Sequence, residues 1–311
     1  MLQQLCRHCA EPVGHGDRYC EQCGAWVMDL RRDRVEVDIG VAAGVSDRGR
    51  QHHRNEDALA LRDIGPCHGG TAVAIVCDGV SSSARPDEAS EVAAEVAAES
   101  LVTALRARDC PAVATRKAIH AAGKAVAALA DSDEAGWDAP ACTVVSAVVA
   151  DDTITVGWVG DSRAYWIPLT RIDSAPAQLT KDDSWRAHVL EAGTLSPAQA
   201  AADHRAHAIT AWLGDDAGSV DPHVVTFEPS GPGVVVICTD GLWTYLDTVD
   251  ELAAALPAQA WRTPLDAARE LIQIALRGGG RDNVTVAVLP FAGDLAGASD
   301  PAAQHHENSS G

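Results

Sequence analysis

The sequence has few basic residues, few aromatic residues and no long apolar run. Its 24 lysines and arginines are outnumbered by 44 acidic residues, which gives a formal net charge of −20 at pH 7. No segment rich in Lys and Arg offsets this charge, so we expect no binding to duplex nucleic acid or to an anionic membrane. No stretch of about 18 apolar residues occurs, which argues against a membrane span.

The start of the chain also lacks the apolar segment of a signal peptide, so we expect a cytoplasmic protein with reduced thiols. The nine cysteines are then interpreted as metal ligands or as small buried hydrophobic residues, and not as a disulfide framework. No internal repeat is present.

The chain divides by composition into four zones. Residues 1–28 hold four of the nine cysteines, and the charged residues 29–37 are predicted to form a linker. Residues 38–291 carry regular secondary-structure signals, and the chain's 47 % of hydrophobic residues is enough for a large core. Residues 292–311 are rich in Gly, Ala, Ser and Asp and are predicted to be a disordered tail.

Short Val-rich runs beside turn residues predict strands in the third zone. They are residues 39–45, 71–77, 143–150, 153–159, 163–167, 223–228, 233–238 and 284–289. Apolar residues at helical spacing predict helices at 87–106, 111–130, 184–192, 248–256 and 264–277. The strands come in consecutive blocks, with two long helices inserted together. This order favours an α+β architecture of antiparallel sheets over a doubly wound parallel sheet.

Four N-terminal cysteines form two C-x-x-C pairs, Cys6 with Cys9 and Cys20 with Cys23. This spacing is typical of a zinc ribbon, in which four thiolates hold one structural Zn²⁺ and leave no open position for catalysis. So small a fragment needs the metal to fold. Its mixture of acidic and basic residues favours docking of a protein, or a structural role, over nucleic-acid binding.

Acidic residues stand at the ends of several predicted strands, often beside glycine. They are Glu56, Asp57, Asp78, Asp240 and Asp282. One Asp-Gly pair after a strand is usually only a turn, but several acidic strand ends in one chain indicate a cation site. Rigid strand ends fix carboxylates well, and Mg²⁺ and Mn²⁺ prefer oxygen ligands.

Seven motifs follow one another along this zone. They are Arg54-Asn55-Glu56-Asp57, Val76-Cys77-Asp78-Gly79, Gly160-Asp161-Ser162-Arg163-Ala164-Tyr165, Leu179-Thr180-Lys181-Asp182-Asp183-Ser184, Ile209-Thr210-Ala211-Trp212-Leu213-Gly214, Thr239-Asp240-Gly241-Leu242 and Asp282-Asn283-Val284-Thr285. In this order they resemble the metal-dependent protein phosphatases of type 2C, over about residues 40 to 290. The resemblance implies a four-layer α-β-β-α sandwich of two antiparallel sheets, with metals at one edge and a variable flap at 182–208.

The resemblance also implies two Mn²⁺ or Mg²⁺ ions and a reaction. Asp78 would bridge both ions, and Asp240 and Asp282 would complete the first site. A hydroxide between the ions would hydrolyse phosphoserine or phosphothreonine in proteins, without a covalent intermediate. The implied partners are signalling proteins phosphorylated by a Ser/Thr kinase.

The resemblance also implies roles for further residues. Glu56 or Asp57, with the carbonyl of Gly79, would serve the second ion, and Asp138 would serve a third, weaker one. Asp161 is expected to be structural and is not counted as a ligand.

The chain departs from the family where an arginine usually binds the substrate phosphate. His52 stands there, flanked by Arg50 and Arg54, and the three would share one face if the segment were extended. Either arginine could supply the cation, or His52 could bind phosphate when protonated. The alternative is that His52 and His53 are merely a polar loop pair.

A second departure follows Gly79, where the family often has two further glycines and this chain has Val80-Ser81-Ser82-Ser83. Neither departure removes an implied metal ligand, so we expect activity. The competing hypothesis is a catalytically weak or inactive phosphatase-like domain that binds phosphoproteins, with the ribbon as its docking module.

Overall fold

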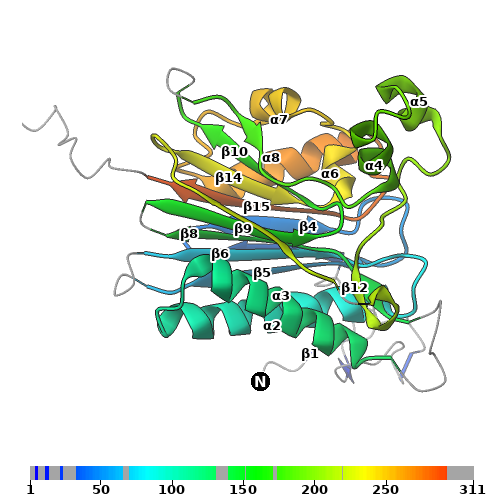
Figure 1. The fold of residues 1–311 in the computed structure, drawn as a ribbon. Helices are drawn as coiled ribbons and strands as arrows, with labels where there is room; N and C mark the ends of the chain where they lie inside the picture. Colours follow the sequence, from blue (N-terminus) through cyan, green and yellow to red (C-terminus); the bar gives the residue numbers. More distant parts are fainter. Residues whose placement is uncertain are drawn as a thin grey trace, which may run out of the picture.

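The structure, a computed structural model, describes residues 4–5, 11–13, 22–23, 33–65, 70–130, 139–150, 152–170, 174–218 and 220–292. Within these ranges two antiparallel sheets stack face to face, and helices cover the two outer faces (Figure 1). The predicted α+β, four-layer arrangement is therefore confirmed. No helix in the described part of the chain is long and apolar enough to cross a membrane.

The first sheet has five strands in the order β13-β9-β8-β6-β5. Their bounds are His223–Phe227, Thr153–Val159, Val144–Ala150, Ala72–Asp78 and Asp57–Asp63. Two helices, α2 (Pro86–Arg106) and α3 (Pro111–Ala127), pack on its outer face.

The second sheet has six strands in the order β11-β10-β14-β15-β4-β3. Their bounds are Ala177–Gln178, Arg163–Pro168, Gly233–Cys238, Val284–Phe291, Ala43–Asp47 and Arg34–Asp38. Its outer face is covered by α8 (Pro264–Arg277), α7 (Val249–Ala255) and the short α6 (Asp240–Trp243).

The remaining elements are short. Helices α4 (Trp185–Glu191) and α5 (Pro197–Ala202) lie at one end of the sandwich, and β12 (Leu213–Gly214) pairs with β7 (Ala141–Cys142) (Figure 1). The 3₁₀ turn η2 (Asp215–Ala217) follows β12.

Alternation along the strands builds three layers of core. On β6, Val73 and Ile75 face the helices, whereas Ala74 and Val76 face the other sheet. On β14, Val236 faces the helices and its neighbours face the other sheet. Both strands are buried on both faces, which explains why their sequences are continuous apolar runs.

The structure differs from the prediction at the start of the phosphatase-like zone. Part of the predicted linker, residues 29–37, belongs to β3, which pairs with β4 at the edge of the six-stranded sheet. Arg34 and Glu36 alternate with Val35 and Val37, and Arg34 donates to Asp47 at 2.6 Å. Charged residues at both ends of the segment obscure this period-two pattern in the sequence. The strand expected at 39–45 begins only at Ala43, after a turn.

The N-terminal cysteine pairs fall largely outside the described residues. Cys6, Cys9 and Cys20 lie there, whereas Cys23 is in an exposed turn. The strands β1 (Gln4–Leu5) and β2 (Pro12–Val13) pair antiparallel and so bracket the first C-x-x-C pair in sequence. The tail from residue 293 also lies outside the described part.

Ile237 tests the packing between the sheets, because its side chain is fully buried there. We expect Ile237→Ala to lower the free energy of unfolding by about 2–5 kcal/mol, and Ile237→Val by about 1 kcal/mol. Val113→Ala is the control, since Val113 is 49 % exposed and a surface change costs under about 0.5 kcal/mol. Urea denaturation measures all three, and equal losses at both sites would contradict the assigned packing.

Candidate active site

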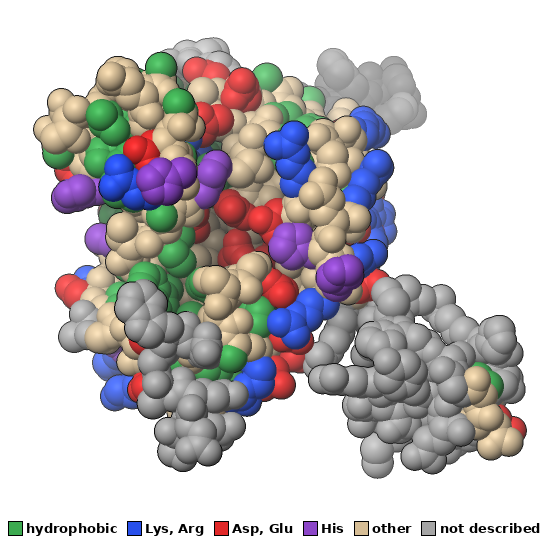
Figure 2. Space-filling model, turned by 90° about the vertical axis from the view of Figure 1, so that its right-hand side faces the viewer, with side chains coloured by type: hydrophobic (Ala, Val, Ile, Leu, Met, Phe, Trp, Pro, Cys, Tyr) green, Lys and Arg blue, Asp and Glu red, His purple; other side chains and the backbone are tan. Residues whose placement is uncertain are grey.

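Four of the predicted acidic residues meet at one end of the sandwich. Asp57 begins β5 and stands directly opposite Asp78, the last residue of β6. Asp240 is the first residue of α6, just after β14, and Asp282 precedes β15. Figure 2 shows acidic side chains on the floor of a hollow, with His, Lys and Arg side chains on both sides.

Asp57 connects the two sheets at this end. Its Oδ2 accepts hydrogen bonds from the hydroxyls of Thr239, at 2.9 Å, and Thr285, at 2.8 Å. Thr285 lies on β15 of the other sheet, and Thr239 directly follows β14 of that sheet. Its Oδ1 is buried and has no hydrogen-bond partner among the described residues. Burial raises the pKa of Asp57 to about 7; the two threonine hydrogen bonds oppose that rise, and the charge of Asp282 adds to it.

Asp78 and Asp240 share this environment. Burial raises the pKa of both carboxyl groups well above the usual range, and the nearby carboxylates add to the rise. Asp57 is the main neighbour acting on Asp78, whereas Asp161 is the main neighbour acting on Asp240.

Asp161 is therefore part of the acidic cluster, although the sequence analysis treated it as structural. It lines the same cavity as Asp78 and Asp240 and is only 5 % exposed. Burial raises its pKa to about 7, helped by Asp182 and opposed by Arg163. Its place directly after β9 repeats the strand-end pattern of the other acids, and this signal could have identified it.

Glu56 is fixed through its backbone at the same end. Its N–H donates to Asn283 Oδ1 at 2.8 Å, and its carbonyl accepts from Gly79 N at 3.1 Å and Ser90 Oγ at 2.5 Å. Asn283 also donates from Nδ2 to the carbonyl of Arg54 at 3.0 Å. Asn283 thus organises the segment before β5, a role that the sequence analysis did not assign.

Close backbone approach explains the two Asp-Gly pairs. A Cβ at Gly241 would lie 1.8 Å from the carbonyl oxygen of Asn283, and one at Gly79 would lie 2.5 Å from that of Pro86. No side chain fits at either position. Glycine therefore lets Asp78 and Asp240 sit where the chain segments converge.

The donor set suits hard divalent cations, which bind carboxylate oxygens and offset their mutual repulsion. The unpartnered Oδ1 of Asp57 and the raised pKa values of its neighbours are the observations that support this fit. As they stand, no three His, Cys, Asp or Glu side chains of the described ranges are arranged to hold a metal ion. The acidic residues therefore fit a divalent cation by their chemistry and their location. Asp138 lies outside the described residues.

The acidic cluster opens into a cavity of about 820 Å³. Its lining comprises Asp78, Gly79, Val80, Ser81, Ser82, Ser83, Ala139, Ala141, Thr143, Asp161, His207, Ala208, Ile209, Trp212, Asp216, Asp240 and Asp282. His207, Ala208 and Ile209 come from the segment predicted as the flap and its exit. The flap starts and ends side by side, because Trp185 N donates to Ala208 O at 2.8 Å and Thr210 N to Asp183 O at 2.8 Å.

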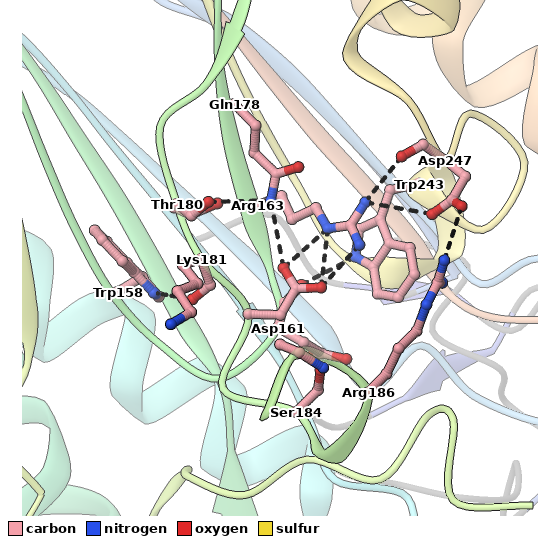
Figure 3. Close-up of polar contacts among 12 residues, drawn as sticks. Trp158, Asp161, Arg163, Gln178, Thr180, Lys181, Ser184, Arg186, Trp243 and Asp247 are labelled. Carbon is pink, nitrogen blue, oxygen red and sulfur yellow. Dashed lines mark hydrogen bonds and ion pairs between the residues drawn. The ribbon is translucent and has the colours of Figure 1, made fainter. Parts of the chain in front are cut away.

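Arg163 anchors the base of the flap (Figure 3). Its guanidinium donates to Asp182 from Nε at 2.9 Å and from Nη2 at 2.8 Å, and lies 3.8 Å over the ring of Trp243. Trp243 Nε1 donates to the carbonyl of Asp161 at 3.0 Å. The flap base, α6 and the acidic cluster therefore form one connected unit.

Two of the three predicted phosphate-binding residues, His52 and Arg54, line a second hollow of about 620 Å³, together with Gln51, His53, Glu56 and Arg281. His52 Nε2 lies 3.1 Å from Asp282 Oδ1. Arg50 does not line this hollow, and residues 49–51 form a turn and not an extended strand. The extended conformation under which residues 50, 52 and 54 would share one face is therefore not present. Arg281, which also lines the hollow, was not identified by the sequence analysis.

Comparison with known proteins agrees with this architecture. The family model of protein phosphatase 2C matches residues 46–273, so the chain belongs to the protein phosphatase 2C family. The resemblance drawn from the seven motifs is confirmed, and with it membership of a family of hydrolases.

Individual relatives are serine/threonine phosphatases. The chain is 30 % identical to serine/threonine phosphatase stp of Listeria monocytogenes over 250 residues, covering 78 % of this chain and 93 % of that protein. The catalytic domain of PstP, solved in complex with two manganese ions, superposes with a TM-score of 0.59 at 26 % identity, covering 80 % and 97 % of the two chains. Stp1 of Staphylococcus aureus shares the fold, with a TM-score of 0.67 at 22 % identity and coverage of 82 % and 96 %.

The raised pKa values predict how pH changes the stability of the metal-free chain. Asp57 and Asp161 titrate at about 7 when folded and near 3.9 when unfolded, so the folded state binds more protons between these values. The stabilisation is complete below pH 4 and is lost as the pH rises through about 7. Urea denaturation in EDTA from pH 4.5 to 8 should show this fall.

The matched variants separate this effect from the overall negative charge. Asp161→Asn should flatten the pH dependence, because it removes one of the titrating groups. Asp152→Asn, at an exposed turn between β8 and β9, should leave it unchanged. An unaltered slope in Asp161→Asn would contradict the assigned environment.

Proposed function

We propose that this chain hydrolyses phosphoserine and phosphothreonine in proteins with the help of two Mn²⁺ or Mg²⁺ ions. The observation that carries the proposal is the gathering of Asp78, Asp240 and Asp282 in the lining of one cleft, with the buried Asp57 paired directly to Asp78 behind them. The phosphatases among its relatives, one solved with two manganese ions, support the same reading.

Each acidic residue has a proposed part. Asp78 would bridge the two ions, Asp240 and Asp282 would complete the first site, and Glu56 or Asp57 with the Gly79 carbonyl would complete the second. When bound, the cations supply an activated water and offset the charge on the phosphoryl oxygens. Asp138 remains the proposed contributor to a third, weaker site.

The rest of the cleft positions the substrate. Residues of the flap segment and of the loop 80–83 line the cleft and would hold the peptide around the phosphorylated residue. His52, Arg54 and Arg50 are the proposed source of the positive charge that orients the phosphate. The substrates we propose are proteins phosphorylated by a Ser/Thr kinase.

The purified chain should release phosphate from p-nitrophenyl phosphate and from phosphothreonine peptides only when Mn²⁺ or Mg²⁺ is added. Asp240→Asn should lower kcat/KM by at least about 100-fold, because it removes a charged ligand. Asp152→Asn, at the far end of the sheet, should retain full activity. Full activity in Asp240→Asn would exclude these ions from the mechanism.

The same assay separates the competing reading, a catalytically weak or inactive domain that binds phosphoproteins. That reading is favoured by His52, which is paired with Asp282 and replaces the usual arginine. Tight binding of a phosphopeptide without turnover, in the presence of either metal, would support it over hydrolysis.

His52 should contribute to phosphate affinity. We expect His52→Arg to lower KM for a phosphopeptide several-fold, because a guanidinium is always charged and binds phosphate through two hydrogen bonds. His52→Ala should raise KM. His120→Arg, an exposed change on α3, is the control for added charge. If both His52 variants match the wild type, His52 is only a loop residue.

For the N-terminal segment we propose a zinc ribbon that docks a partner protein or stabilises the chain. The two C-x-x-C pairs and the β1–β2 pairing around the first of them support this. Elemental analysis should find about one zinc per chain, and the double variant Cys20→Ser, Cys23→Ser should lose it. Cys110→Ser, an exposed cysteine after α2, should retain the zinc. Zinc-free wild-type protein would overturn the proposal.

A further inference from the structure

Glu56 lines the second hollow, beside the acidic cluster, and both of its carboxylate oxygens already have donors. Ser81 Oγ donates to Oε2 at 2.6 Å, and Arg54 Nε donates to Oε1 at 3.0 Å. The residue is only 8 % exposed. Its backbone N–H and carbonyl are also bonded, as described above, so both backbone and side chain are held.

Arg54 is itself held in place. Its Nη1 lies 3.2 Å from Asp87 Oδ1, in the first turn of α2, while its Nε reaches Glu56. The guanidinium therefore bridges two carboxylates. Because half of the Arg54 side chain is exposed, this bridge alone is a weak restraint on Glu56.

Ser81 reaches Glu56 from a well-defined turn. Val80 N donates to Ala141 O at 2.9 Å, and Ser83 N donates to Val80 O at 2.7 Å, which closes the turn around Ser81. Ser83 Oγ also accepts from Ala141 N at 3.2 Å. The turn is thus tied to β7, and Ser81 lies at the position where the family often has glycine. A glycine there has no hydroxyl to offer.

We propose that Ser81 is a positioning residue that holds the Glu56 carboxylate ready for the second divalent cation. The inference rests on the proposed function and goes beyond it, because it assigns a role to a residue outside the ligand set. A glutamate has three side-chain torsions, and fixing them before the cation binds removes an entropic cost from binding. A hydrogen bond from a neighbouring group to a ligand is the usual way in which proteins orient it.

The test is a titration of the full-length chain with Mn²⁺, in which the electron paramagnetic resonance signal of hydrated Mn²⁺ counts the free ions. In Ser81→Ala and Ser81→Gly we expect one of the two dissociation constants to rise about tenfold and the other to stay unchanged. Ser81→Thr keeps the hydroxyl and should restore most of the affinity.

Ser82→Ala is the matched control, since Ser82 lies in the same turn and is exposed like Ser81, whereas the hydroxyl that donates to Glu56 is that of Ser81. Circular dichroism and the melting temperature verify that all variants are folded. Affinities of Ser81→Ala equal to those of Ser82→Ala would overturn the proposal. Tighter binding in Ser81→Ala would also overturn it, because the hydroxyl would then be competing with the cation for Glu56.

The Mn²⁺ dissociation constants test the role of Ser81 independently of whether the chain hydrolyses phosphopeptides. A wild-type chain that binds two Mn²⁺ but does not cleave phosphopeptides would refute the hydrolase proposal, while Ser81 would still be judged on its dissociation constants alone. A wild-type chain that binds fewer than two Mn²⁺ would overturn both.

Discussion

The hydrogen bonds from Thr239 and Thr285 to Asp57 are the contact on which the site depends. Asp57 belongs to the five-stranded sheet, whereas Thr285 lies on β15 of the six-stranded sheet and Thr239 directly follows β14, so this contact ties the sheets together at one end. Because Asp57 is also paired with Asp78, the strand register brings a second carboxyl group to the same place. A slip of one residue in either strand would turn one of these side chains to the opposite face.

The cluster is costly for the folded chain on its own. Asp57, Asp78, Asp161 and Asp240 all have raised pKa values, because burial and neighbouring negative charge disfavour their ionised forms. Surrounding packing and hydrogen bonds, such as those of Asn283 and Arg163, hold the carboxyl groups in this unfavourable arrangement. Such an arrangement is expected where a divalent cation is to be bound, since the bound ion offsets the electrostatic repulsion among the carboxylates.

The cleft walls are joined to this cluster and do not merely surround it. Arg163 connects the base of the flap to Trp243 on α6, the helix that starts at Asp240. On the other wall, the turn of Val80 to Ser83 is tied to β7 and contacts Glu56 through Ser81. A change in either wall is therefore transmitted to the residues proposed to hold the cations.

Sequence reasoning recovered most of the longer strands, the long helices and the antiparallel layering, because alternation and helical spacing are local properties. It did not predict β5 (Asp57–Asp63) as a strand. It missed β3, whose charged residues hid the alternation, and it discounted Asp161, whose neighbours come from distant segments. It also considered an extended segment at residues 50–54, a condition that the turn at residues 49–51 does not meet. Local pattern carries no information about which strand ends meet, and this limits what it can say about a site.

The sequence by itself determined the family, the identity of the four central carboxylates and the α+β class. The order of the motifs and the periodicity of apolar residues can be read directly from the sequence. Only the tertiary structure decided that Asp57 bridges the sheets, that Asp161 joins the cluster, and that Ser81 and Arg54 both bind Glu56. Except for Arg54 and Glu56, which are two positions apart, these contacts join residues that are 25 or more positions apart in the sequence. They arise from sheet pairing and loop geometry, which no single segment specifies alone.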